Sequence, residues 1–534
     1  MYLPSGPKHK KPHLCIDDRS ERRFLIAGGP ERVNPLTTKI ALLLWPLLTV
    51  IVASRVRPAI AASSLLLGAI LFLPTLAAFD FPLLPPIGRE EIASLSLLGV
   101  LLLFYPKKFF AARPGLGAES LILVVMLSGI GTAYTNSDAL VYGPRILPSV
   151  TLKDAFSDAA RDFLHYFVPF LTARVVFRSR RDLRDLLLVL AVFGLIYSLP
   201  ILVELRLSPQ LNRWIYGFFP HSFHQHVRDS GYRPMVFMPN GLAVAQFIAL
   251  CTIAAAALTV ARARFLPIEG KLVTAYLASI LVLCKGMAAT LYAGAGLILV
   301  HLTTPRLRAT LAVSLAAFAT AFPLLRGYGL FPTDSVVAAI SRINAERAHS
   351  LNYRFINEDL LLEKAQERIL FGWGGFSRGR VFDPRHGGSI TVTDGFWIIQ
   401  LGQSGILGTL PIFGMIGLPV LLVYRRLPHV RSAQHRSMLA SLAVIVGLTS
   451  IDLLPNGMFT YLPIILAGAL LGTTEGLQRT HRNRPAPHGR AQPEEDSPKT
   501  AKEDATGPQP TSVSVPGTTS DRSASLAAAR RKKR

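Results

Sequence analysis

The stretch TKIALLLWPLLTVIVAS runs from residue 38 to residue 54 and contains one charged residue, Lys39. About 20 apolar residues are needed for a helix to cross a hydrocarbon core that is about 30 Å thick. A second long apolar run covers residues 183–204, and similar runs recur along most of the chain. Runs of this length and number predict an integral membrane protein.

The composition agrees with this interpretation. Of the 534 residues, 50% are hydrophobic and only 17% are charged, whereas a soluble domain has roughly 25% charged residues. The three cysteines, Cys15, Cys251 and Cys284, are too few and too scattered to predict a disulfide framework or a zinc site. The formal net charge of +24 does not predict nucleic-acid binding, because the basic residues concentrate in short loops and at the two ends.

The predicted fold class is an all-α integral membrane protein, a polytopic bundle of about 12 transmembrane helices. The membrane domain covers residues 37–475, and residues 271–302 are interpreted as two short helices that break at Cys284, Lys285 and Gly286. The predicted spanning segments are 37–54, 59–78, 91–106, 117–135, 157–177, 183–205, 235–262, 271–302, 307–325, 394–424, 436–451 and 458–474.

Loops rich in Lys and Arg predict which side faces the cytoplasm. They cover residues 106–113, 178–184, 303–308 and 424–436. Counting outward from them places 136–156, 206–234, 326–393 and 452–457 on the outer face. The basic segment 1–36 is expected to stay in the cytoplasm. If residues 271–302 form two helices, however, the number of helices is odd and this segment would lie outside. To resolve this conflict, either the turn at 54–58 is no cytoplasmic loop or an early segment is re-entrant.

The tail, residues 476–534, is rich in Pro, Ser, Thr and charge and ends in RRKKR. This composition is typical of a disordered cytoplasmic segment, and a weak attraction to anionic lipid is the alternative interpretation. No phosphate-binding glycine loop is visible, which disfavours an ATP-driven pump.

The longest predicted outer loop, residues 326–393, contains LNYRFINEDLLLEKAQERIL at 351–370. Its apolar residues recur at near-helical spacing and predict one amphipathic helix on the rim of the membrane domain. They are Leu351, Phe355, Leu362, Ala365 and Ile369. Arg354 and Glu358 lie four residues apart and would form an ordinary surface ion pair.

After this helix come FGWGGF (371–376), a polar loop, Asp394 and GFWIIQLGQSGILG (395–408). This order resembles the signature region of the O-antigen ligase and O-antigen polymerase superfamily. RPMVFMPNGLA (233–243), CKG (284–286) and DLLPNG (452–457) resemble further elements of that family. The resemblance covers roughly residues 230–475.

The resemblance implies a metal-independent glycosyltransferase without a cofactor, located in the bacterial inner membrane as a multi-pass protein. It would move a glycan from an undecaprenyl diphosphate carrier to an acceptor, either a growing glycan chain or the lipid A core. The implied partners are thus the lipid-linked donor, the acceptor and membrane lipid, and no nucleic acid.

Transfer from a diphosphate carrier develops negative charge on the leaving group, so fixed cations at the membrane surface would stabilise the transition state. Guanidinium groups bind phosphate oxygens bidentately. The candidates are Arg233, Lys285 and Arg354, which lie in the family-like elements. Lys285 interrupts apolar sequence, where a charge is costly and is a functional candidate by default; the alternative is a lysine in a short turn that reaches water.

The reaction also needs a base for the acceptor hydroxyl. The family places a histidine before the signature helix, where this chain has Asp394. His386 lies eight residues earlier, so the predicted catalytic residues are His386 and Asp394, with a base outside this loop left open. A carboxylate can act as a base if its pKa is raised towards the working pH.

Asn240 is predicted either to cap the helix that follows or to bind the glycan. Asp452 has the same two interpretations. His221, His224 and His226 invite a metal-binding interpretation, which is disfavoured because no carboxylate accompanies them at ligand spacing. No metal site is predicted.

Two other functions remain open. A secondary transporter or flippase would fit the helix count and the intramembrane charge, but no inverted repeat is visible. A noncatalytic subunit of a polysaccharide assembly complex is the other alternative.

Overall fold

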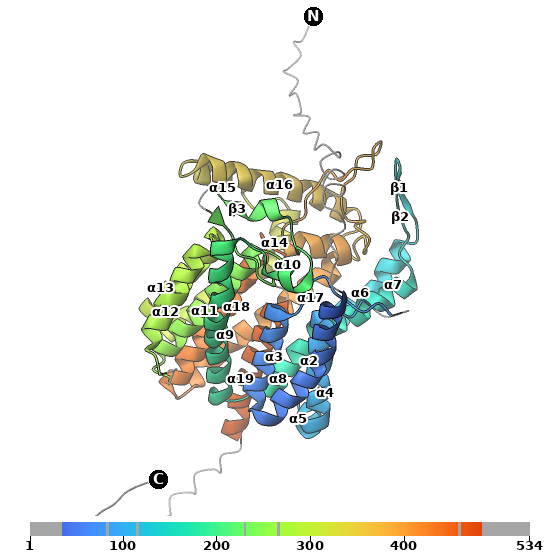
Figure 1. The fold of residues 1–534 in the computed structure, drawn as a ribbon. Coiled ribbons are helices and arrows are strands. Elements are labelled where there is room, and N and C mark those ends of the chain that lie inside the picture. Colours follow the sequence, from blue (N-terminus) through green and yellow to red (C-terminus); the bar gives the residue numbers. More distant parts are fainter. Residues whose placement is uncertain are drawn as a thin grey trace, which may run out of the picture. The chain divides into compact units, whose positions relative to one another are not determined.

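The structure is a computed structural model that describes residues 35–81, 85–113, 117–228, 231–263, 267–457 and 461–482. Most of these residues are helical, and two short antiparallel hairpins, β1–β2 and β3–β4, are the only sheets among them. The basic N-terminal segment and most of the predicted disordered tail lie outside the described residues. The described part of the chain is therefore almost entirely helical, as the predicted all-α class requires (Figure 1).

The elements that precede the predicted outer loop are α2 (Pro35–Arg55), α3 (Pro58–Phe72), α4 (Arg89–Phe104), α5 (Pro106–Ala111), α6 (Ser120–Thr135), β1 (Leu140–Tyr142), β2 (Arg145–Leu147), α7 (Leu152–Asp162), the π-helix η1 (Phe163–Phe167), α8 (Val168–Val176), α9 (Arg180–Leu207), α10 (Leu211–Tyr216), η2 (Phe223–His226), β3 (Val227–Arg228), β4 (Gly231–Tyr232), α11 (Gly241–Val260), α12 (Gly270–Leu283), α13 (Met287–Leu302) and α14 (Pro305–Gly327). The later elements are α15 (Thr333–Ser341), α16 (Ala345–Gln366), α17 (Phe396–Arg426), η3 (Leu427–His429), α18 (Ala433–Asp452) and α19 (Tyr461–Arg482).

Among the described residues, five helices are long and apolar enough to cross a membrane by length and composition. They cover Leu36–Arg55, Arg180–Leu207, Gly241–Val260, Pro305–Gly327 and Phe396–His429. Every predicted apolar segment coincides with at least one helix, and the predicted break at Cys284–Gly286 separates α12 from α13. One boundary is wrong: α19 continues to Arg482, so residues 476–482, predicted as part of the disordered tail, are helical.

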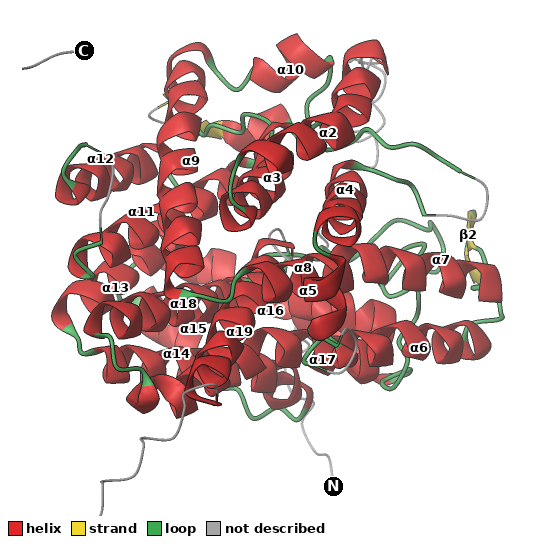
Figure 2. Cartoon of the chain, turned by 90° about the horizontal axis from the view of Figure 1, so that it is seen from below, coloured by secondary structure: helices red, strands yellow, loops and turns green. Residues whose placement is uncertain are grey.

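Helices α11 and α18 form the centre of the packing. Almost every side chain of α11 is buried, and both helices are apolar around their whole circumference, as expected for a helix enclosed by others. Small residues allow close approach: a Cβ added at Gly447 of α18 would lie 3.0 Å from the carbonyl oxygen of Ala312 in α14. Figure 2 shows α12 and α13 on one side of this centre and α6 and α7 on the other.

The helices run between two ends. At one end α11 begins, α14 and α18 finish, and α15 and α16 lie across the helix ends (Figure 1); we call this the α16 end. At the other, the arginine end, α9 begins, and Arg57 after α2 pairs with Asp185 of α9 at 2.7 Å. The hydroxyl of Thr37, near the start of α2, donates to the Ile215 carbonyl just beyond the far end of α9. Helix α2 therefore starts at the α16 end and not at the arginine end. This start agrees with an odd number of helices.

The amphipathic helix predicted at 351–370 is present as α16, which begins earlier and ends earlier. Phe355, Leu362 and Ala365 are buried and Leu351 is half-buried, as predicted. Ile369 does not belong to the stripe, because the helix ends at Gln366 and Ile369 is 38% exposed. The backbone there has another role: the Ile369 carbonyl accepts a hydrogen bond from Ile406 of α17.

Helix α17 breaks at Gly405, which has a left-handed φ of +61°. This break frees the N–H groups of Ile406 and Leu407, and they donate to the carbonyls of Ile369 and Leu370. A Cβ at Gly405 would overlap the Leu370 carbonyl group, so only glycine fits. The predicted single segment 394–424 is thus two helical pieces that meet at Gly405, where the backbone is hydrogen-bonded to the outer loop.

Candidate functional site

The predicted cations Arg233 and Lys285 lie next to each other at the α16 end. The guanidinium Nη2 of Arg233 donates to the backbone carbonyl of Lys285 at 2.9 Å, across 52 residues of sequence. A Cβ at Gly241 would overlap the Cγ of Arg233, so the side chain runs directly over the start of α11. The arginine is held against the break between α12 and α13.

Lys285 occupies the apex of the α12–α13 hairpin. Its φ of +54° is in the left-handed region that a non-glycine residue rarely adopts. Its side chain is half-buried, and its ammonium would lie 3.4 Å from a Cβ at Gly231 in the β3–β4 hairpin. The residue is therefore at the end of the bundle rather than at the middle of a helix, as the turn interpretation predicts.

A buried carboxylate that the sequence interpretation missed holds the segment after Arg233. Glu204, at the end of α9, accepts hydrogen bonds from the backbone N–H groups of Met235 and Val236, both at 2.7 Å, and of Leu211 at 3.0 Å. Its side chain is almost fully buried. A glutamate within an apolar run was the available signal, since such a residue needs buried partners.

The third predicted cation, Arg354 of α16, meets two other family-like elements. Its Nη1 donates to the Pro455 carbonyl at 3.2 Å, and its Nε lies 3.5 Å from Oδ2 of Asp394. Both side chains are about one-third to two-fifths exposed. The start of α17 is fixed to the same turn, because Phe396 N–H donates to the Leu453 carbonyl. Arg354 and Asp394 are thus brought together and remain accessible.

Tyr292 lies near Arg354 and Asp452. It lies in the second turn of α13, seven residues after Lys285, which is about 10 Å along a helix. Its hydroxyl is within electrostatic range of both Arg354 and Asp452. Asp452 itself accepts from the Asn456 side chain at 2.9 Å. Arg233, Lys285 and Arg354 thus lie at the same end of the bundle in two separate contacts, Arg233 with the Lys285 backbone and Arg354 with Asp394.

Glu358 is a second functional candidate that the sequence interpretation took for a surface residue. It is largely buried, and its Oε2 lies 3.6 Å from Nη2 of Arg326 at the end of α14. Burial raises the pKa of the Glu358 carboxyl to about 7, although the charges of Arg326 and Arg354 oppose this rise. Arg326 also pairs with Asp359 at 2.7 Å, so α16 is fixed to α14 by two carboxylates.

The remaining predicted residues have local roles in the structure. The side-chain oxygen of Asn240 accepts from the N–H groups of Leu242 and Ala243, which is the helix cap that one interpretation predicted.

His386 lies in a turn around Asp383, whose carboxylate accepts from the backbone N–H groups of Arg385 and His386. These two bonds lower the pKa of Asp383. The His386 side chain is 82% exposed and lies 3.4 Å from Asp383. The turn packs on the β1–β2 hairpin, because a Cβ at Gly143 would overlap the Arg385 carbonyl. Among the described residues, no contact brings His386 to Arg354 or Asp394.

The GWGG turn lies along the first part of α17. Trp373 N–H donates to the Gly402 carbonyl and Gly374 N–H donates to the Gln403 carbonyl, both at 2.8 Å. The turn separates two cavities that share Gly374, Ser377 and Gln403. One, of about 180 Å³, reaches Thr393 beside Asp394. The other, of about 320 Å³, extends to α7 and approaches the size of small-ligand sites.

The larger cavity has a charged wall on α7. Asp158, Arg161 and Asp162 line it, and Arg161 pairs with Asp158 at 3.0 Å. This polar wall faces the backbone of Gly374 and Gly375. Hydroxyl-rich ligands such as sugars need paired donors and acceptors of this kind.

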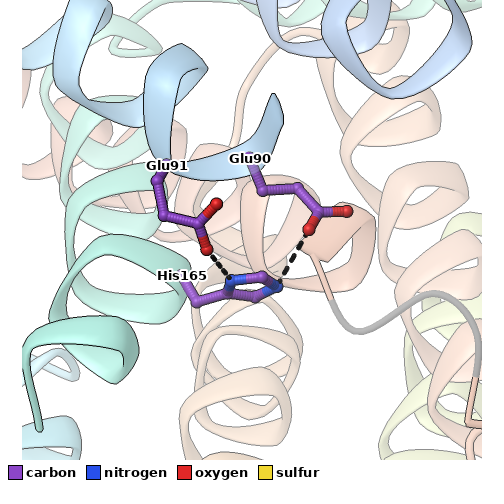
Figure 3. A group of neighbouring side chains, drawn as sticks. All are labelled: Glu90, Glu91 and His165. Carbon is purple, nitrogen blue, oxygen red and sulfur yellow. Dashed lines mark hydrogen bonds and ion pairs between the residues drawn. The ribbon is translucent and has the colours of Figure 1, made fainter. Parts of the chain in front are cut away.

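Among the described residues, one cluster has residue types that can hold a metal ion. Ligand atoms of Glu90, Glu91 and His165 lie within 4.8 Å of one another. Figure 3 shows the imidazole between the carboxylates, with Nδ1 3.3 Å from Glu91 and Nε2 3.6 Å from Glu90. Because each ring nitrogen faces a different carboxylate, and Glu91 also accepts from Gly88 N–H, the arrangement fits a bridge between α4 and η1.

Of the histidines in and before η2, His226 is engaged in hydrogen bonds, whereas Nδ1 of His221 is buried and has no hydrogen-bond partner among the described residues. His226 accepts from Gly241 N–H at Nε2, and its Nδ1 lies 3.0 Å from the Ser222 carbonyl. A metal ion at His226 would have to displace one of these bonds. The side chain of His224 lies outside the described residues.

Comparison with known proteins adds no relative. No family model matches the chain, and no curated protein matches it. The resemblance to the O-antigen ligase and polymerase superfamily therefore stays a prediction from the motifs, and the function has to be argued from the residues of this chain.

Proposed function

We propose that this protein is a membrane glycosyltransferase that moves a glycan from a polyprenyl diphosphate carrier to an acceptor sugar at the α16 end. The observation that supports the proposal is that Arg233, Lys285 and Arg354, from three separate parts of the chain, all lie at the α16 end. There Arg233 bonds to the Lys285 backbone, and Arg354 pairs with the accessible carboxylate Asp394.

In the proposed reaction, an acceptor hydroxyl oxygen attacks the anomeric carbon of the donor glycan. The bond between that carbon and the diphosphate oxygen breaks, and its electron pair leaves with the polyprenyl diphosphate. Arg233 and Lys285 stabilise the charge on this leaving group, because they are fixed before the reaction begins. Arg354 binds the diphosphate or orients Asp394.

The base in this proposal is Asp394, which takes the proton of the acceptor hydroxyl. It is 41% exposed and adjoins the cavity of about 180 Å³ beneath the GWGG turn. Glu358 has the pKa that a base at neutral pH needs, but its carboxylate is buried against Arg326. We therefore assign Glu358 to holding α16 in place.

The proposal extends to topology. An odd number of membrane crossings close to twelve, with the α16 end on the outer, periplasmic side of a bacterial inner membrane, would bring the cations to the leaflet where a translocated lipid-linked glycan lies. The arginine end supports this direction, because it carries the basic loops expected in the cytoplasm.

The test uses a deletion strain complemented with the wild-type protein, Arg354→Ala, Lys285→Ala or the control Arg347→Ala. Arg347 is an exposed arginine on the same helix as Arg354. We expect carrier-linked glycan to accumulate in the deletion strain and to be cleared by wild type and Arg347→Ala only. An unchanged glycan profile in the deletion strain would favour transport or a noncatalytic role in an assembly complex.

A further inference from the structure

A cleft of about 460 Å³ opens at the arginine end, where α9 and α18 begin and α11 finishes. It lies at the opposite end of these helices from the proposed transferase site. Its lining residues are Arg180, Arg181, Arg184, Arg262, Gln434 and Met438.

The charge of this cleft is one-sided. Four of its six lining residues are arginines, and none is acidic. Asp185, which follows Arg184 in sequence, is buried and shared, because it pairs with Arg184 at 3.1 Å and with Arg57 at 2.7 Å. Asp182 is occupied by the capping box of α9, where it accepts from the backbone and hydroxyl of Ser179. Within the described part of the chain, Arg184 pairs with Asp185, whereas Arg180, Arg181 and Arg262 form no ion pair.

The cleft is also built by contacts between its walls. Arg180 donates from Nη1 to the Ser432 hydroxyl at 3.2 Å, which joins α9 to the start of α18. Gln434 donates to the carbonyl of Arg262, which has a left-handed φ of +49°. The Nε of Arg184 is buried and has no hydrogen-bond partner within the described part of the chain. The arginines therefore converge on one space and do not simply spread over a basic surface.

We propose that this cleft binds the phosphate group of an anionic lipid headgroup. Guanidinium groups bind phosphate oxygens bidentately and remain charged at any physiological pH. The cleft lies at the ends of two candidate spanning helices, Arg180–Leu207 and Gly241–Val260, so it meets the membrane at headgroup level. Basic pockets between membrane helices are known to take anionic headgroups. This assignment does not depend on the transfer reaction.

The experiment measures lipid binding to the purified full chain in neutral detergent, by native mass spectrometry, with phosphatidylglycerol, phosphatidylcholine or inorganic phosphate as probes. The test variant is Arg181→Gln with Arg262→Gln, both exposed residues of the cleft. The matched control is Arg306→Gln with Arg425→Gln, which removes two exposed arginines outside the cleft lining.

We expect wild type to retain phosphatidylglycerol over phosphatidylcholine, and the cleft variant to bind it roughly 25-fold more weakly, at about fivefold per arginine. The control pair should leave the affinity within about twofold. Equal losses in both pairs would overturn the proposal, since the attraction would then be a diffuse surface effect. If millimolar inorganic phosphate displaced bound phosphatidylglycerol as strongly as added phosphatidylglycerol does, the cleft would be a site for a free anion instead.

A second variant protects the test from misfolding. Arg181→Lys with Arg262→Lys keeps both charges and loses only the bidentate geometry, so its affinity should lie between wild type and the glutamine pair. Lysine and glutamine pairs that bind equally weakly, with unchanged melting temperatures, would contradict a charge-based site.

Discussion

The Arg233 guanidinium donates a hydrogen bond to the backbone carbonyl of Lys285 at 2.9 Å. The two residues come from different family-like motifs, and the bond places one cation at the base of the turn that carries the other. This arrangement fixes two positive charges at the rim before any substrate arrives.

Replacing Arg233 by Ala should lower the rate of glycan transfer by about 100-fold, the usual effect of losing one fixed group that stabilises transition-state charge. Arg233→Lys keeps the charge but loses the fork that reaches Lys285, so it should retain intermediate activity. Transfer kinetics on purified protein measure both, with Arg347→Ala as the control. Full activity in Arg233→Ala would remove this residue from the site.

Asp394 and His386 can be separated as candidate bases. Asp394→Asn should lower kcat by about 100-fold or more, since general-base catalysis contributes on this scale, and His386→Ala should leave kcat unchanged. The structure motivates the difference, because Asp394 contacts Arg354 whereas His386 faces solvent beside Asp383. The reverse pattern would move the base to His386 and require the loop to fold back in the complex.

The raised pKa of Glu358 predicts how stability depends on pH. The folded state holds the Glu358 proton up to a pKa of about 7, above the ordinary glutamate pKa of 4.5. The folded protein therefore binds more protons than the unfolded chain between these values, and this group's stabilisation is lost as pH rises from about 4.5 to about 7. A difference of one in pKa between the folded and unfolded states corresponds to about 1.4 kcal/mol, so Glu358 contributes at most about 3 kcal/mol.

Glu358→Gln removes this titration and leaves the pair of Arg326 with Asp359 in place. Melting temperatures in detergent should fall less for Glu358→Gln than for wild type between pH 5 and pH 8. The matched control is Glu363→Gln, an exposed glutamate on the same helix. Parallel pH curves for wild type and Glu358→Gln would show that the carboxyl is ionised in the folded state at both pH values.

Glu204 should be essential for the Arg233 segment. Glu204→Ala leaves three backbone N–H donors without their acceptor, and each unsatisfied buried group costs about 1–3 kcal/mol. We expect a clear fall in melting temperature together with a weaker apparent affinity for the lipid-linked donor. Glu204→Gln keeps one acceptor oxygen and should recover part of both. Wild-type stability in Glu204→Ala would mean that water replaces the carboxylate.

The sequence predicts the helices well because long apolar runs have one stable arrangement in a membrane. The break at Lys285 and the cap at Asn240 are equally local features, and both are present. The pairing of Glu358 with Arg326 was not predictable, since it depends on where α14 ends relative to α16. The same holds for His386, whose turn packs on a hairpin more than 200 residues earlier in the chain.

Transfer by the purified protein tests directly whether this chain is a glycosyltransferase. Proteoliposomes would receive a labelled polyprenyl diphosphate glycan and an acceptor glycan, and both the elongated product and the released polyprenyl diphosphate would be measured. We expect wild type and Arg347→Ala to form the two products in equal amounts, and Arg354→Ala and Lys285→Ala to form almost none. Donor that crosses the bilayer without losing its glycan would contradict a transferase and identify a transporter.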